Sequence, residues 1–225
     1  MTTTRERLIE AAFDLFAERG FDATTVDDVA LRAGVGRSTF FRNFSSKEEV
    51  VFPDHPALLT AVQDRLDSAG RGTALLALTE ASRLVLRSYL DEGEHARTRY
   101  GLTRTVPQLR AREIAGQQRY LRVFRTFLHE RMGGGPEHAL EAELMANAVV
   151  TAHNHVLRRW LRGESDEATS LAEFERAMTV VARQLPDAGG TPPEDEGSTV
   201  VVIRSARPSS ELLAAIRAAA APVLD

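Results

Sequence analysis

Residues 30–46 carry charged side chains of a type that binds nucleic acid. Every charged residue in this range is an arginine, namely Arg32, Arg37 and Arg42, and Lys47 follows directly. Lys47 is also the only lysine in the chain. Guanidinium and ammonium groups bind phosphates, and an arginine can bridge guanine O6 and N7 with two hydrogen bonds. A solvated helix face would carry the same charges, so the elements that hold these residues decide between the two interpretations.

The spacing of apolar residues predicts that this segment is a helix-turn-helix. Its first part shows one apolar helical face, formed by Val26, Val29, Ala30 and Ala33. Thr25 and Asp28 have the spacing of a capping box at its start. Gly34 then permits the positive φ that a tight turn needs, and Phe40 and Phe44, four residues apart, give the second helix a buried face. The arginines therefore belong to a motif that enters the major groove of DNA.

A longer helix over residues 4–19 is expected to precede this segment. Its apolar positions recur with helical spacing, at Leu8, Ile9, Ala12, Phe13, Leu15 and Phe16. Gly20, with apolar Phe21 after it, indicates a left-handed cap at the end of this helix. The three helices would form a compact head, whose expected core is Phe13, Phe16, Val29, Phe40 and Phe44.

The chain resembles the DNA-binding head of the TetR/AcrR family of bacterial transcriptional regulators over the run FDATTVDDVALRAGVGRSTFFRNFSSKEEVV, residues 21–51. Beyond the head, only the helical pattern and the length agree. The resemblance implies an all-α homodimer with one DNA-reading head per subunit, which binds a palindromic operator. It also implies that a small molecule bound in the larger helical domain releases the operator, so the expected function is that of a ligand-responsive repressor.

The resemblance places the DNA-contacting residues on and beside the second helix of the motif, at Arg37, Ser38, Thr39, Phe41, Arg42, Asn43 and Lys47. Arg37 or Arg42 would read guanine, Asn43 would pair with adenine, and Lys47 would meet a phosphate. Two positions depart from the family pattern, which often has tyrosine at position 41 and histidine at position 43. Phe41 has no hydroxyl for a phosphate, so its ring would pack either on a thymine methyl or sugar or on its own neighbours.

Length and composition argue against several other classes of protein. The chain has 225 residues, a net charge of −4 and no cysteine, so it carries no global basic field, disulfide framework or thiolate metal site. No apolar run approaches the roughly 20 residues that span a bilayer, and the amphipathic start is unlike a secretory signal. There is no GxSxG, HExxH or phosphate-loop motif, and His153 and His155 are two apart, which separates them on a helix. We therefore expect a cytoplasmic protein that is not an enzyme and has no cofactor, metal or membrane partner.

Proline and glycine residues divide the rest of the chain into further helices. We predict a helix-turn-helix domain over residues 1–50 and a helical ligand-binding and dimerisation domain over residues 51–186. Residues 187–225 would be an extension of unknown role, with a linker, a possible short strand (TVVVIR) and a possible short helix. The sequence FPDHP, residues 52–56, is either a hinge or a loop insertion. The larger domain is expected to contain helices from near Pro56 to Leu66 and near 72–91, 94–103, 106–131, 136–162 and 168–185.

Two groups of residues in the middle of this domain are candidates for ligand contact. One group lies near one side of the helix expected at 106–131, and the other forms a polar line on the following helix: Gln117, Tyr120 and Phe124, and Asn147, Thr151 and Asn154. Buried polar groups need partners, and a ligand is one such partner. Hydrogen bonds between helices or a wet interface would also satisfy them, and more commonly do. A cavity there would be mainly apolar and would suit a hydrophobic or amphipathic effector.

The last two expected helices are where the resemblance implies a dimer interface, in the form of a four-helix bundle. Their apolar positions are Leu140, Leu144, Val149, Val156, Trp160, Leu171, Phe174, Met178, Val181 and Leu185. The same positions would serve equally as core within one subunit. The alternative function is a helical module that binds a small molecule or a protein and no longer reads DNA. The sequence determines neither the effector, nor the operator, nor the choice between repression and activation.

Overall fold

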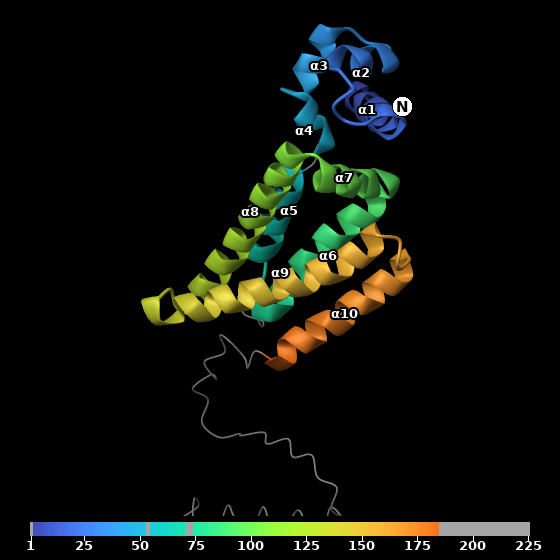
Figure 1. The fold of residues 1–225 in the computed structure, drawn as a ribbon. Helices are drawn as coiled ribbons and strands as arrows, with labels where there is room; N and C mark the ends of the chain where they lie inside the picture. Colours follow the sequence, from blue (N-terminus) through green and yellow to red (C-terminus); the bar gives the residue numbers. More distant parts are fainter. Residues whose placement is uncertain (1, 53–54, 71–73, 185–225) are drawn as a thin grey trace, which may run out of the picture. The chain divides into compact units, whose positions relative to one another are not determined.

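The computed structural model describes residues 2–52, 55–70 and 74–184, which all belong to one unit, Met1–Gly190. Within these residues every regular element is helical, which confirms the predicted all-α fold (Figure 1). The predicted strand and helix of the extension, Leu185, and Pro53 and Asp54 of the possible hinge lie outside the described residues. The helices are α1 Thr4–Arg19, α2 Val26–Arg32, α3 Arg37–Asn43, α4 Lys47–Val51, α5 His55–Asp67, α6 Ala74–Glu92, α7 Glu94–Thr105, α8 Pro107–Arg131, α9 Ala139–Leu161 and α10 Glu167–Gln184, with a 3₁₀ turn at Pro136–His138.

Local capping interactions fix the ends of the short helices. The capping box at the start of α2 is confirmed, because the Thr25 side chain accepts from the backbone of Asp28 and the Asp28 carboxylate accepts from the backbone of Thr25. The turn between α2 and α3 uses Gly34 at φ +69°, as expected. Ser46 caps α4 by accepting from the backbone of Glu49, and the Glu49 carboxylate accepts from the backbone of Ser45.

The head formed by α1 to α4 has the predicted core and one unpredicted partner. Phe13, Phe16, Val29, Phe40 and Phe44 are all buried. The buried cluster that contains the last four of these residues continues into the end of α7 and the start of α8 through three further apolar residues, Leu102, Val106 and Leu109. The ring of His95 on α7 also stacks on Phe13 of α1, with centroids 4.7 Å apart. The head is therefore packed directly on α7.

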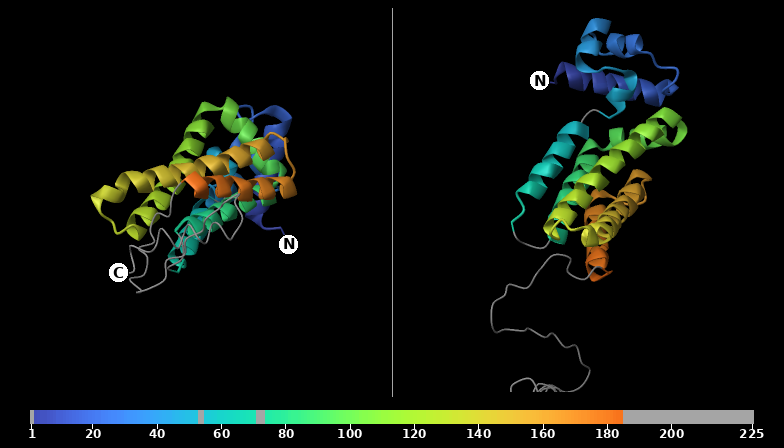
Figure 2. Two further views of the ribbon diagram at one scale, coloured as in Figure 1. Left: turned by 90° about the horizontal axis from the view of Figure 1, so that it is seen from below. Right: turned by 90° about the vertical axis from the view of Figure 1, so that its left-hand side faces the viewer.

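A second core joins α5, α6, α8, α9 and α10. α9 and α10 run side by side along this core (Figures 1 and 2). Most apolar positions considered for a dimer interface are instead core within one subunit, namely Val149, Val156, Trp160, Phe174, Met178 and Val181. Leu140 and Leu144 differ, with 67% and 56% of their surface exposed. Across the described part of the chain, no helix is long and apolar enough to cross a membrane.

Candidate nucleic-acid interface and effector cavity

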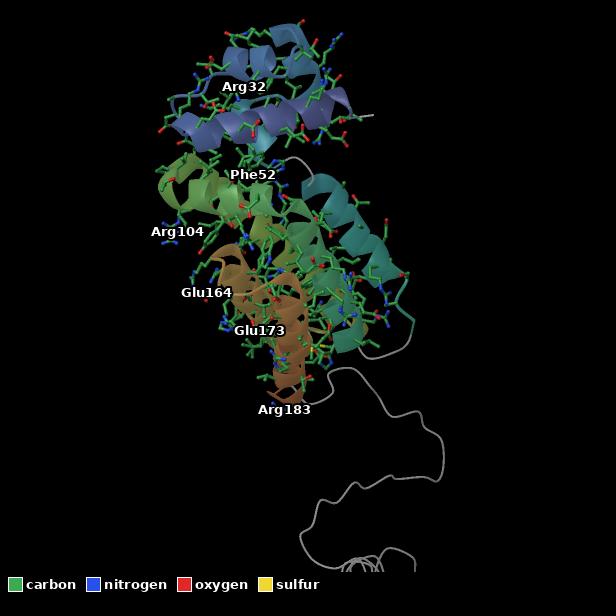
Figure 3. All side chains as sticks on the ribbon, turned by 90° about the vertical axis from the view of Figure 1, so that its right-hand side faces the viewer. Arg32, Phe52, Arg104, Glu164, Glu173 and Arg183 are labelled. Atoms are coloured by element: carbon green, nitrogen blue, oxygen red, sulfur yellow. The ribbon has the colours of Figure 1, made fainter. Side chains whose placement is uncertain are left out.

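The exposed face of α3 gathers most of the predicted DNA-contacting residues. Arg37, Ser38, Phe41 and Arg42 are exposed and lie on one side of the helix, because residues four apart share a helical face. Thr39 and Asn43 on α3, and Lys47 at the start of α4, are half-buried. Phe40 is fully buried beneath and anchors the helix on the head core. The side chains of the head are drawn in Figure 3, where Arg32 on α2 marks this part of the molecule.

The two arginines of α3 are held differently. Arg37 forms an ion pair with Asp27 of α2 at 2.6 Å, and both side chains are 61% exposed. Arg42 donates to the Thr39 hydroxyl at 2.9 Å. The Phe41 ring lies edge-on to Phe40 and under the Arg37 guanidinium, yet 45% of its surface is exposed. Phe41 thus packs on its neighbours and still offers apolar surface to a partner.

Arg32 lies on α2 and differs from the arginines of α3, because it connects α2 to the first helix of the head. It donates two hydrogen bonds to the Glu18 carboxylate, at 2.9 and 2.8 Å, and so ties α2 to α1. This hydrogen bonding lowers the pKa of Glu18. The sequence grouped Arg32 with the other basic residues, whereas the structure places it at the end of α2, where its two hydrogen bonds to Glu18 hold two helices of the head together.

Lys47 has a structural role that its sequence position did not predict. Its ammonium donates to the carbonyls of Phe21 and Thr24, at 2.6 and 2.7 Å, and lies 4.0 Å from the centroid of the Phe21 ring. Partial burial lowers the pKa of this lysine. A compact ammonium with three donors fits between two carbonyls, which a planar guanidinium does less well. The presence of a single lysine among 28 basic residues was the available signal.

A cavity opens between α6, α7, α8 and α9. Of the six candidate ligand residues, Gln117, Tyr120, Phe124 and Asn154 line it. The other two, Asn147 and Thr151, are exposed on α9 and are not among the residues that line it. The remaining lining residues are Ser82, Val85, Tyr89, Tyr100, Glu113, Val150, His153, Leu157, Arg158 and Leu161.

The cavity wall is rich in uncharged hydrogen-bonding groups. The chain has three tyrosines, Tyr89, Tyr100 and Tyr120, and all of them line this cavity. Burial lowers the pKa of His153 to about 4, so its imidazole is neutral near pH 7. Two buried atoms of the wall, His153 Nδ1 and Ser82 Oγ, have no hydrogen-bond partner within the described residues. Buried polar atoms of this kind need a partner, which a bound molecule or water supplies.

Within the described residues, no three His, Asp or Glu side chains lie close enough together to hold a metal ion. His153 is buried and faces the cavity, whereas His155 is exposed on the opposite side of α9.

The lining of the cavity consists of apolar and aromatic side chains and neutral polar groups, together with two residues of opposite charge, Glu113 and Arg158.

Comparison with known proteins places both parts of the chain. Residues 8–52 match the family model described as bacterial regulatory proteins of the tetR family, and residues 73–186 match the MftR C-terminal domain. The chain is 30% identical to MftR of Mycobacterium tuberculosis over 177 residues, which cover 76% of this chain and 85% of that protein. It is also 30% identical to the transcriptional regulator TcmR of Streptomyces glaucescens over 191 residues, covering 81% and 84% of the two chains.

Solved structures show the same fold at lower identity. The complex of SmeT with triclosan superposes with a TM-score of 0.61 at 19% identity, covering 87% of this chain and 99% of that one. FadR of Bacillus subtilis in complex with stearoyl-CoA superposes with a TM-score of 0.59 at 18% identity, covering 78% and 96%.

Proposed function

This chain belongs to the TetR family of DNA-binding transcriptional regulators, a non-enzymatic family, and on that premise we propose that it is a repressor released from a palindromic operator by a small hydrophobic or amphipathic molecule. The observation that carries the DNA-binding part is the exposed face of α3, on which Arg37, Phe41 and Arg42 lie together. Arg42 is the side chain best placed to read a base, because it is exposed and donates within its own helix, to the hydroxyl of Thr39.

Arg37 would join Arg42 on DNA after leaving Asp27. Exposed ion pairs contribute only about 0–1 kcal/mol, so a phosphate or a guanine competes easily for this guanidinium. Lys47 would contribute its third N–H to a phosphate while two remain on the carbonyls of Phe21 and Thr24. Ser38, Thr39 and Asn43 complete the proposed contact set, for phosphate or base edges.

The proposed homodimer uses the outer face of α9 and α10. Leu140, Leu144, Asn147 and Thr151 fall on one stripe of α9, and Leu140 and Leu144 are more than half exposed. Val180 adds exposed apolar surface, 48% accessible, on the neighbouring helix α10. A two-fold axis through such a stripe would pair each patch with its own copy and present two heads to the half-sites of a palindrome. Asn147 and Thr151 would then serve the dimer rather than the effector.

The proposed effector binds in the cavity, in contact with Gln117, Tyr120, Phe124 and Asn154. Mixed aromatic and aliphatic walls with a few neutral polar groups suit a molecule that is largely apolar and carries hydrogen-bonding substituents. The fold that SmeT uses with triclosan and that FadR uses with stearoyl-CoA supports an effector of this general character.

The test is a titration of the purified protein with the DNA upstream of its own gene, at fixed salt and with scrambled DNA as competitor. We expect Arg42→Ala to weaken specific binding by about 5- to 150-fold, the range for one lost bidentate base contact. Arg125→Ala removes another exposed arginine, from α8, and is the control. If wild type fails to prefer its upstream DNA over the scrambled sequence, the chain is instead a binding module without DNA reading. Equal losses in both variants would argue against a specific role for Arg42.

A further inference from the structure

A buried arginine on α7 contacts both the DNA-binding head and the cavity wall. Only 4% of the surface of Arg99 is exposed, which is unusual for an arginine. Its Nη1 lies 2.6 Å from the Glu92 carboxylate and 3.4 Å from the carbonyl of Val51, and its guanidinium lies 5.1 Å from the centroid of the Tyr89 ring. A buried ion pair gains little stability over an apolar pair, because both charges lose water. Arg99 therefore calls for an explanation other than stability.

The partners of Arg99 belong to different functional parts. Val51 is the last residue of α4, and it is fully buried in the core of the head. Tyr89 lies on α6 and lines the cavity, and Glu92 is the last residue of α6. α7, which carries Arg99, packs on both α1 and α6 and lies between the head and α6 in Figure 1. One guanidinium thus connects the wall of the cavity with the end of α4.

We propose that Arg99 is the positioning residue that transmits occupancy of the cavity to α4, and through α4 to the recognition helix α3. This inference rests on the proposed function, because it names the device by which the same cavity would control the same head. An effector that moves the Tyr89 ring takes away the surface on which the guanidinium lies. A buried cation cannot turn to water, so it must follow the ring or Glu92, and the Val51 carbonyl then loses its donor.

The short length of α4 makes its end sensitive to the contact between Arg99 and the Val51 carbonyl. α4 has five residues, so its last carbonyls have few partners within the helix and depend on outside donors. A positive charge at the carbonyl end of a helix is also electrostatically favourable. A turn of three residues, 44–46, joins α3 to α4, so a shift at the end of α4 alters the angle at which α3 meets DNA. Glu113, which lines the cavity, adds attraction to Arg99 and is a second route by which a ligand would disturb it.

The proposed relay consists of the contacts that lead from Tyr89 through Arg99 to the Val51 carbonyl. Its test needs no knowledge of the effector, because a substitution in the cavity wall disturbs the first of these contacts. Tyr89→Leu removes the ring under Arg99 while leaving Arg99 itself intact, and Arg99→Lys keeps the charge but not the planar fork. We measure hydrogen exchange of the α4 backbone in the full chain, and operator affinity at fixed salt. Both variants are expected to speed α4 exchange and to weaken operator binding by about tenfold, the factor for one hydrogen bond. Tyr89→Phe, which keeps the ring, is expected to restore the wild-type values.

A double variant tests whether Tyr89 and Arg99 act together, and a second arginine of α7 serves as a control. If Tyr89 acts through Arg99, the combination of Tyr89→Leu with Arg99→Lys has no larger effect than either change alone. Arg97→Lys is the control, because Arg97 lies on the same helix, pairs with Glu94 at 2.8 Å and lies 4.8 Å from the centroid of the Trp160 ring. We expect it to leave α4 exchange at the wild-type level.

Two outcomes would overturn the proposal. One is normal α4 exchange in Tyr89→Leu, since a purely structural Arg99 would not respond to a cavity residue. The other is full additivity of the two changes, which would mean that they act separately. If the proposed function is wrong, the wild-type protein will show no specific DNA binding. In that case hydrogen exchange of α4 still tests whether Tyr89 acts on α4 through Arg99.

Discussion

Replacing Lys47 with methionine should weaken the fold and the DNA contact together. The Lys47 ammonium is the donor that holds the carbonyls of Phe21 and Thr24, between the end of α1 and the start of α2. Methionine keeps much of the apolar stem beside the Phe21 ring but removes both hydrogen bonds and the charge. The variant therefore isolates the ammonium from the rest of the side chain.

The expected loss of stability follows from these contacts. A hydrogen bond to a charged group contributes roughly 1.5–3 kcal/mol, and a cation over an aromatic ring contributes about 0.5–1 kcal/mol at an exposed site. Lys47 is half-buried, so water can reach the carbonyls once the ammonium is gone. We therefore expect a loss of about 2–3 kcal/mol in the free energy of unfolding, rather than the full sum. At about 2–4 °C per kcal/mol for a chain of this size, Tm should fall by about 4–12 °C.

Urea and thermal unfolding measure this loss, with Arg32→Met as the control. Arg32 also donates two hydrogen bonds, to Glu18 at 2.9 and 2.8 Å, but its side chain is 41% exposed and that of Glu18 is 53% exposed. Exposed pairs contribute only about 0–1 kcal/mol. If Lys47→Met costs no more than Arg32→Met, the structural role of the ammonium is refuted.

DNA titration over a range of salt concentrations tests the second role of Lys47. Loss of one phosphate contact should reduce the slope of log K against log salt by about 0.9. Binding to all sequences should weaken alike, because phosphate contacts carry no base information. A lowered stability with an unchanged slope would show that the ammonium stays on its two carbonyls in the complex, and Lys47 would then not be a phosphate contact.

Three further predictions test the head, the cavity wall and the dimer. Asp27→Asn should strengthen DNA binding by up to about fivefold, because it frees Arg37 from its exposed ion pair; a weaker complex in binding titrations would contradict this. Burial lowers the pKa of His153 from 6.5 to about 4, so the unfolded chain binds more protons between these values. The free energy of unfolding should therefore fall by about 3 kcal/mol as pH drops through that window, and His153→Gln should remove this share of the fall in urea titrations. Leu144→Asp should convert the dimer to monomer in sedimentation, whereas Leu76→Asp, at a leucine of almost equal exposure (55% against 56%), should not.

Most of the helices and their ends could be predicted from the sequence, because they depend on neighbours in the chain. The capping box of Thr25 and Asp28, the positive φ of Gly34 and the buried face of Phe40 and Phe44 each involve residues no more than four apart. Such interactions follow from the geometry of one helix turn. The resemblance of residues 21–51 was specific for the same reason, since this motif is short and continuous.

The tertiary structure decided which side chains meet across helices, because that depends on contacts between distant parts of the chain. Asn147 and Asn154 lie on the same stripe of α9, yet Asn154 lines the cavity and Asn147 is exposed. The periodicity of one helix cannot distinguish them, because only the neighbouring helices cover one position and leave the other open. The roles of Lys47 and Arg99 likewise depend on hydrogen bonds to carbonyls that lie 23 to 48 residues away in the sequence. The sequence alone thus determined which elements form and what the head binds, whereas packing determined where buried charges and cavity walls lie.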